Sequence, residues 1–323
     1  MIKAKEVRVL KAPFPWFGGK SKVAHLVWQR FGDVPNYVEP FAGSLAVLLG
    51  RPHEARLETV NDLDCYLANF WRATTQAPME VAKWADWPVN EADLHARHLW
   101  LLNREEFRQA MRTDPDYFDA KVAGWWVWGL CQWIGSGWCA ERNYNGEGNA
   151  KQQLPHLGDA GRGVHRPSQQ LPHLGNAGRG DLYEYFAHMQ ARLRRVRVTC
   201  GDWSRVLGET VTTKQGVTGV FLDPPYAQDL RDDLYSVERS VSDDVRQWAI
   251  ENGDNAMLRI ALCGYADEHA MPDSWTAVAW KAAGGYGSQG EGRGRENAHK
   301  EMIWFSQHCL PVERQPVALS LFD

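Results

Sequence analysis

The stretch NYVEPFAGSLAVLLG, residues 36–50, decides the fold. An apolar run leads into a turn that holds Gly43, and a second apolar run with helical spacing follows. Residues 57–73, LETVNDLDCYLANFWRA, repeat this order, with a short strand that ends at Asn61–Asp62 before a helix. Strands that alternate with helices predict a parallel sheet covered by helices.

Working outward from this stretch, the chain changes character twice. Residues 74–135 lose the strand signal and predict helices, and Asp114–Pro115–Asp116 is a plausible start of the last one. Residues 135–180 are rich in glycine, asparagine and arginine. Within them the segment QQLPHLGDAGRG, at 152–163, recurs as QQLPHLGNAGRG at 169–180. A solenoid needs at least three repeats, so two copies indicate a duplicated loop.

Strand and helix patterns return after residue 180, and KEMIWFSQ (300–307) is expected to form the last strand. We therefore expect one α/β domain built from residues 1–73 and 181–323. The segment 74–180 is expected to be a helical and Gly-rich insertion into it.

Composition narrows the class of protein. The chain has 323 residues, of which 44% are hydrophobic, enough for a sizeable core. No apolar run approaches the roughly 20 residues that span a bilayer, and no secretory segment opens the chain. Six scattered cysteines without C-x-x-C predict free thiols in a reducing compartment, and hence a cytoplasmic protein. For the oligomeric state, a monomer is the default expectation.

A metal site is not predicted. His156 and His173 occupy equivalent places in the duplicated loop, but no further ligand accompanies them.

The distribution of charge is more informative than the net charge of −4. Cations dominate residues 1–30, and a second group lies at 192–197, namely Arg192, Arg194, Arg195 and Arg197. A basic face on a weakly acidic protein fits contact with phosphates. A solvated helix face explains the second group equally well.

FLDPPYAQDL, residues 221–230, carries the clearest chemical signal. An amine attached to an aromatic ring is a weak nucleophile, because its lone pair is delocalised into the ring. The Asp223 carboxylate and the Pro224 carbonyl would accept its two hydrogens and localise that lone pair, while two prolines fix the direction of the carbonyl. Tyr226 offers a face for stacking. The alternative is a plain proline turn after a strand.

Two weaker signals lie upstream. In nucleoside-binding α/β sheets a glycine turn and an acid about 20 residues later hold one ligand, as Gly43 and Asp62 would here. In FPWFGGK, residues 14–20, Gly18–Gly19 lets the backbone approach a ligand and Lys20 offers a cation. Each also fits an ordinary loop before a helix.

The motifs FPWFGGK, VEPFAGSLAVLL, VNDLD, CGDW and FLDPPY, in this order, resemble the DNA adenine-N6 methyltransferases of the Dam (D12) type. The likeness spans about 1–75 and 181–310. It implies a Rossmann-like S-adenosylmethionine-dependent methyltransferase sheet with a target-recognition insertion. It also implies S-adenosylmethionine as methyl donor and an adenine flipped out of double-stranded DNA as acceptor, in a prokaryotic cell or a phage-infected host.

The resemblance also implies roles for particular residues, grouped by what they would contact. The catalytic set is Asp223, Pro224 and Tyr226; the donor set is Trp16, Gly19, Lys20, Phe41, Gly43, Asp62 and Asp202; and the phosphate set is Arg293, Arg295 and Lys300. One position departs from the pattern: the usual F-x-G-x-G would have a second glycine where this chain has Leu45.

Alternatives stay open at this point. The acceptor could be the N4 amine of cytosine, although S-P-P-Y is the commoner form there. The chain could be a catalytically silent DNA-binding homologue, or a transferase of another group. A restriction partner and an orphan or phage methylase are equally compatible with the motifs. The tryptophans at 125, 126, 128, 133 and 138 favour a buried helix over wedges for a flipped base.

Overall fold

The computed structural model describes residues 10–14, 16, 19–88, 90–133, 138–139, 179–225, 235–280 and 301–312. Within them one sheet of seven strands runs in the order β3-β2-β1-β4-β5-β7-β6. The strands are β1 (Asn36–Glu39), β2 (Leu57–Asp62), β3 (Val196–Cys200), β4 (Thr218–Leu222), β5 (Leu258–Tyr265), β6 (Thr276–Ala279) and β7 (Glu301–Phe305). The predicted α/β class with a Rossmann-like sheet is confirmed.

The strand order reverses between β1 and β4. From β1 the chain proceeds outward to β2 and β3, whereas from β4 it proceeds the other way to β5, all in parallel. In open α/β sheets, ligands bind outside the carboxyl ends of the strands at such a switch point. The Gly43 turn follows β1 and Asp223 follows β4, so the sheet brings the two strongest sequence signals to one crevice.

The far side of the sheet ends in an antiparallel pair. β7 lies between β5 and β6 and runs antiparallel to both, with Tyr265 paired to Glu301 and Ala279 to Met302. The strand predicted in KEMIWFSQ is therefore present, whereas β6 was not anticipated. β6 has four residues, three of them exposed, so it lacks the apolar signal that marks the buried strands.

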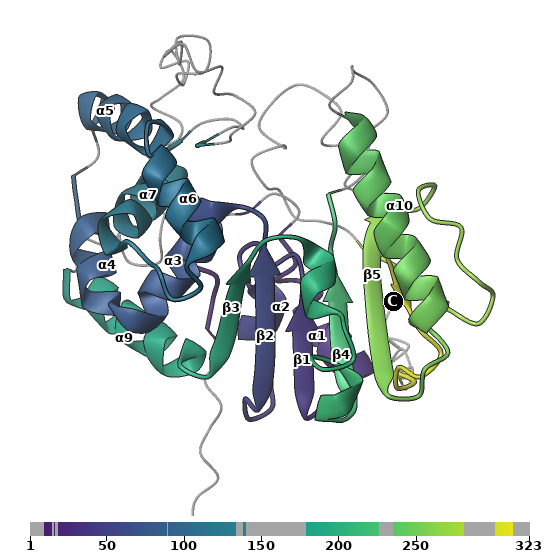
Figure 1. The fold of residues 1–323 in the computed structure, drawn as a ribbon. Helices are drawn as coiled ribbons and strands as arrows, with labels where there is room; N and C mark the ends of the chain where they lie inside the picture. Colours follow the sequence, from purple (N-terminus) through teal and green to yellow (C-terminus); the bar gives the residue numbers. More distant parts are fainter. Residues whose placement is uncertain are drawn as a thin grey trace, which may run out of the picture.

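The helices are distributed unevenly around the sheet (Figure 1). Most of them gather beyond the β3 edge, while α10 lies against β5. The bounds are α1 (Ala24–Phe31), α2 (Ala46–Leu49), α3 (Cys65–Gln76), α4 (Pro78–Ala85), α5 (Glu91–Leu102), α6 (Glu105–Thr113), α7 (Ala120–Gln132), α9 (Arg179–Leu193) and α10 (Tyr235–Asn252), with 3-10 turns η5 (Trp203–Val206) and η6 (Thr213–Gln215).

The start of α7 corrects the sequence-based expectation. Asp119, not the Asp114–Pro115–Asp116 turn, is the N-cap, and its carboxylate accepts hydrogen bonds from the amides of Lys121 and Val122, both at 2.9 Å. Asn69 on α3 exchanges hydrogen bonds with the backbone of Asp119. The local N-cap signal of Asp119 and its contact with α3 together fix where the helix begins.

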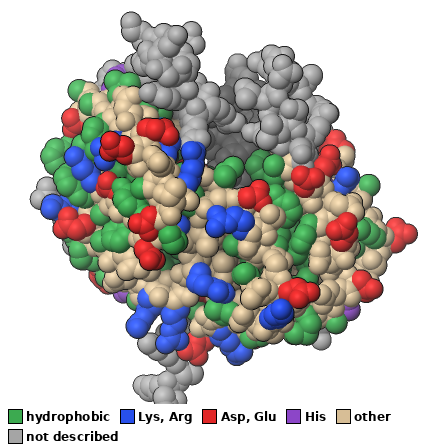
Figure 2. Space-filling model, viewed as in Figure 1, with side chains coloured by type: hydrophobic (Ala, Val, Ile, Leu, Met, Phe, Trp, Pro, Cys, Tyr) green, Lys and Arg blue, Asp and Glu red, His purple; other side chains and the backbone are tan. Residues whose placement is uncertain are grey.

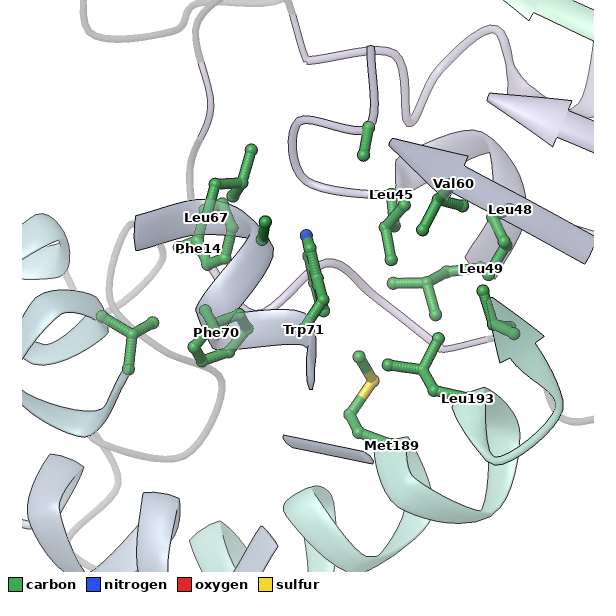
Figure 3. Packing of buried hydrophobic residues seen from close by; sticks show 14 of the residues in the cluster. Phe14, Leu45, Leu48, Leu49, Val60, Leu67, Phe70, Trp71, Met189 and Leu193 are labelled. Carbon is green, nitrogen blue, oxygen red and sulfur yellow. The ribbon is translucent and has the colours of Figure 1, made fainter. Parts of the chain in front are cut away.

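One hydrophobic cluster joins the sheet to α3, α4, α7 and α9. Figure 3 shows part of it around Trp71, with Leu45, Leu48, Leu49 and Val60 on one side and Met189 and Leu193 below. Four of the five tryptophans considered as wedges are buried: Trp126, Trp128, Trp133 and Trp138. The interpretation of this segment as core is confirmed for them.

All six cysteines lie within the described residues, where each is a buried thiol outside any disulfide, as predicted. No described helix has both the length and the apolar character needed to cross a bilayer. The duplicated loop at 152–163 and 169–180 falls outside the described residues, apart from the backbone of the first turn of α9.

Candidate active site

The turn after β1 brings three of the predicted donor-binding residues together. Gly43 has φ 46°, and a Cβ there would lie 2.8 Å from the indole nitrogen of Trp16. Its amide donates to the Asp62 carboxylate at 3.1 Å. Its carbonyl accepts from the Trp71 indole at 3.1 Å. Only glycine fits between these groups, because any side chain would collide with Trp16.

Asp62 lies at the end of β2, and its carboxylate already accepts hydrogen bonds from backbone amides. Besides Gly43, it accepts from the amide of Asp64 at 2.9 Å. Burial raises its pKa, an effect that the surrounding amides oppose. A carboxylate has about four acceptor positions, so Asp62 can brace the Gly43 turn and still accept a ligand hydroxyl.

The departure at Leu45 has a structural answer. Leu45 adopts φ 55° and ψ 26°, the left-handed conformation that a glycine would take without strain. Its side chain is fully buried and lies beside Val60 and Leu49 in the core (Figure 3). The turn therefore keeps the backbone shape of the glycine pattern, and core packing offsets the strain.

An aromatic wall follows at the neighbouring strand ends. The rings of Phe41 and Trp203 are stacked, with centroids 6.2 Å apart and an interplanar angle of 26°. Asp202, directly before Trp203, accepts from the amide of Ser204 at 2.9 Å and so caps η5. Trp203 was not among the predicted site residues, although it stands in the quoted motif CGDW beside Asp202. Asn61 joins these strand ends, because its amide donates to the carbonyls of Pro40 and Gly201.

Lys20 meets the proposed catalytic acid directly. Its Nζ lies 2.9 Å from the Asp223 carboxylate and 3.9 Å from that of Glu301 on β7. The Lys20 side chain is 4% exposed, whereas that of Asp223 is 21% exposed. Burial alone lowers the pKa of Lys20, but Asp223, Cys263 and Glu301 together raise it above the usual value, so the side chain stays an ammonium.

This corner holds two groups that the sequence did not single out. Trp280, directly after β6, places its ring with the centroid 5.4 Å from Lys20 Nζ. Glu301 opens β7 and is buried. No local pattern marks either residue, because both reach the corner through the antiparallel β6–β7 pair.

The remaining predicted site residues divide into two groups. Gly19 is exposed and donates to the carbonyl of Trp16 at 3.1 Å, which closes the loop before α1. Pro224 is buried next to Asp223. Four predicted residues lie outside the described part of the chain, so their placement stays a prediction: Tyr226, Arg293, Arg295 and Lys300.

The second basic group does not belong to this site. Arg192 binds the buried Glu58 through both terminal nitrogens, at 2.6 and 2.9 Å, and is therefore structural. Arg194 and Arg195 are exposed but precede β3, which places them at the amino-end edge of the parallel strands. Figure 2 shows Lys and Arg side chains along the lower edge of the molecule, opposite the carboxyl ends. Phosphate contact by the exposed arginines of this group stays a prediction, away from the candidate site.

Comparison with known proteins bears on the first third of the chain. Residues 16–123 match the model of the D12 class N6 adenine-specific DNA methyltransferase family. A search of curated proteins found no match. The matched segment contains Trp16, Lys20, Gly43 and Asp62, the residues of the corner and of the turn described above.

The resemblance inferred from the ordered motifs is therefore confirmed over residues 16–123, where the chain is similar to the D12 class N6 adenine-specific DNA methyltransferases.

Proposed function

We propose that this protein transfers a methyl group from S-adenosylmethionine to the N6 amine of adenine in double-stranded DNA. The observation that carries the proposal is that the candidate donor-binding turn and the candidate catalytic acid lie side by side at the switch point. The Gly43 turn and Asp62 follow β1 and β2, and Asp223 follows β4, the direct neighbour of β1. The matched family consists of enzymes of this kind.

The residues after β1, β2 and β3 fit the donor. Asp62 and Asp202 present carboxylates that can accept from hydroxyl and amine groups. Phe41 and Trp203 form a flat apolar wall beside them, suited to a purine ring. The missing Cβ at Gly43 lets the Trp16 indole pack directly against the backbone of this turn. When bound, S-adenosylmethionine supplies an electrophilic methyl group on a sulfonium.

Asp223 and the Pro224 carbonyl act on the acceptor. Both accept N–H bonds from the adenine amine, which turns its lone pair toward the methyl carbon. An N–C bond forms as the C–S bond breaks, and the electron pair of that bond stays on sulfur. The amine then carries an excess proton, which the Asp223 carboxylate is positioned to take. In-line contact at about 3–3.5 Å supplies the rate advantage of proximity.

The acceptor base must leave the duplex to reach Asp223. Unstacking costs a few kcal/mol, which stacking on Tyr226 and the amine hydrogen bonds would offset. We propose residues 74–180 as the target-recognition region, inserted between the two parts of the catalytic domain (1–73 and 181–323). Of the described helices within it, α4, α6 and α7 pack on α3, α4 also packs on α9, and α5 packs on α7.

The test is methyl transfer to unmethylated duplex DNA. The protein is incubated with methyl-labelled S-adenosylmethionine and DNA, which is then digested to nucleosides. We expect label in N6-methyladenine, and its loss in Asp223→Ala with donor affinity kept. Label in N4-methylcytosine would move the acceptor to cytosine. No label, with DNA affinity unchanged by Asp223→Ala, would identify a silent DNA-binding protein instead.

A further inference from the structure

Glu301 is a buried carboxylate placed at the catalytic corner without a full set of partners. It is 6% exposed, and its Oε2 lies 3.9 Å from Lys20 Nζ. Among the described residues, that oxygen has no hydrogen-bond partner. Buried carboxylate oxygens are normally paired, so an unpaired one beside a reactive acid calls for a function.

Two carboxylates here share one cation. Lys20 is closer to Asp223, at 2.9 Å, than to Glu301. Burial raises the pKa of Glu301, Lys20 lowers it, and Asp223 raises it again. The ammonium can therefore balance one acid fully only by leaving the other less well balanced.

The surroundings hold Glu301 and Trp280 in place beside the ammonium. Trp280 covers one side, with its ring centroid 5.4 Å from Lys20 Nζ. The amide of Trp280 donates to the Glu301 carbonyl at 3.0 Å, and Glu301 pairs with Tyr265 in the sheet. Glu301 and Trp280 are thus fixed by strand pairing, while the long Lys20 side chain is the part that can shift.

We propose that Glu301 is a positioning residue that takes over the Lys20 ammonium while Asp223 accepts the hydrogens of the target amine. This inference rests on the proposed function. In the structure Lys20 occupies Asp223, which the incoming amine needs as an acceptor. A movement of about 1 Å toward Glu301 brings its ammonium into hydrogen-bond distance of the unpaired oxygen.

Charge balances through the step. Before the target amine binds, the ammonium pairs with the Asp223 carboxylate, and it moves to Glu301 when the amine arrives. When the methylated amine gives its proton to Asp223, that acid becomes neutral and the ammonium keeps a counter-charge on Glu301. No further proton donor or cofactor is required.

The test uses Glu301→Gln in the full-length protein, which keeps the shape and removes the charge. We expect kcat to fall about tenfold, equivalent to ~1.4 kcal/mol, with donor affinity and KM for DNA unchanged. Glu301→Asp, which keeps the charge, should recover part of the loss. Glu268→Gln is the matched control, since Glu268 binds Ser242 and the Tyr265 amide in the same part of the sheet. Its kcat should stay within about twofold of wild type.

A double-mutant cycle shows whether Glu301 acts through Lys20. In a Lys20→Met background, Glu301→Gln should change kcat by less than about twofold. A full tenfold effect there, or none in the wild-type background, would overturn the inference. Unfolding free energies of the same four proteins give a second cycle that needs no activity. Non-additive values support the shared ammonium, and additive values refute it.

Failure of the proposed function looks different. A wild-type protein that transfers no methyl group under any of these conditions refutes that function and the takeover with it. An active wild type with an unaffected Glu301→Gln variant refutes the takeover alone.

Discussion

At the scale of single residues, Leu45 shows how a departure from a motif can keep its geometry. A non-glycine residue in the left-handed conformation costs about 1–2 kcal/mol. Burying a leucine side chain in a packed core gives more than that, about 2–5 kcal/mol on Leu→Ala scales. The chain therefore retains the backbone shape of the turn and uses the side chain in the core.

The contrast between alanine and glycine at this position tests that account. Both Leu45→Ala and Leu45→Gly lose the core contacts, so both are destabilised by at least about 2 kcal/mol. Only glycine relieves the backbone, so we expect the Gly variant to be about 1 kcal/mol more stable than the Ala variant in urea unfolding. At Leu48, which is equally buried but helical, the order should reverse. The same order at both positions would contradict the role of backbone strain.

Glu39 is a second residue with a measurable signature. It is buried at the end of β1, and burial raises its pKa well above 4.5, opposed by the hydrogen bond from Tyr37 at 2.9 Å and reinforced by Asp223. A carboxyl with a raised folded-state pKa binds its proton more tightly in the folded state. Its stability contribution is therefore complete below the unfolded pKa and is lost as the pH rises through the folded pKa.

Glu39→Gln should remove this pH dependence, because an amide can still accept from Tyr37 and does not ionise. We expect the unfolding free energy of wild type to fall relative to that of the variant as the pH rises from about 5 to about 9. Urea unfolding of both proteins across that range measures the difference. A constant difference would show that Glu39 has an ordinary pKa.

At the scale of elements, close helix packing explains a glycine that propensity disfavours. Gly124 lies inside α7, where a Cβ would meet the Trp84 Cβ at 2.4 Å and the Val81 carbonyl at 2.8 Å. Both belong to α4, the helix that packs most extensively on α7. Glycine in a helix costs up to about 1 kcal/mol of stability relative to alanine. Its presence here indicates that close packing of α7 on α4 contributes more than this cost.

Gly124→Ala should accordingly destabilise the protein by about 1–3 kcal/mol, although alanine favours the helix. Thermal or urea unfolding measures the change. Gly208→Ala is the control, since nothing lies within 4 Å of a Cβ there, and its stability should change by less than about 0.5 kcal/mol. Equal effects at the two positions would argue against the packing contact.

The elements also show what sequence could and could not predict. The turns after β1 and β2 were predictable, because glycine, acid and apolar periodicity are local signals. β6 was not, because it is short and mostly exposed and depends on pairing with β7. The start of α7 offered two acidic start signals, and the structure uses Asp119, which Asn69 also contacts. The site divides in the same way. Asp223, Gly43 and Asp62 stand in motifs, whereas Glu301 and Trp280 are found only once the sheet is assembled.

At the scale of the whole molecule, the position of charge relative to the sheet separates two basic groups. Arg194 and Arg195 stand at the amino-end edge, away from the switch point. Arg293, Arg295 and Lys300 precede β7 in sequence and remain the predicted phosphate contacts. On the proposed function, a DNA duplex whose base reaches Asp223 would approach from the carboxyl ends.

Salt dependence of DNA binding distinguishes the groups. Replacing Arg293, Arg295 and Lys300 with glutamine should weaken binding and reduce the slope of log K against log salt by about 0.9 for each lost phosphate contact. Replacing Arg194 and Arg195 should leave affinity and slope unchanged. Both are measured by fluorescence anisotropy with labelled duplex DNA over a range of salt. Loss of slope in the Arg194/Arg195 variant would place DNA on the opposite edge.

The placement of β7 has a consequence for biosynthesis. β6 pairs with β7, so it gains its partner in the sheet only when residues 301–305 have been made. A nascent chain emerging from the ribosome already holds Lys20 and Asp223, but the edge of β5 is bare until β7 arrives. β7 thus completes both this side of the sheet and the Lys20–Glu301 part of the corner. A nascent chain that lacks β7 would expose the unpaired edge of β5, which favours association with other strands.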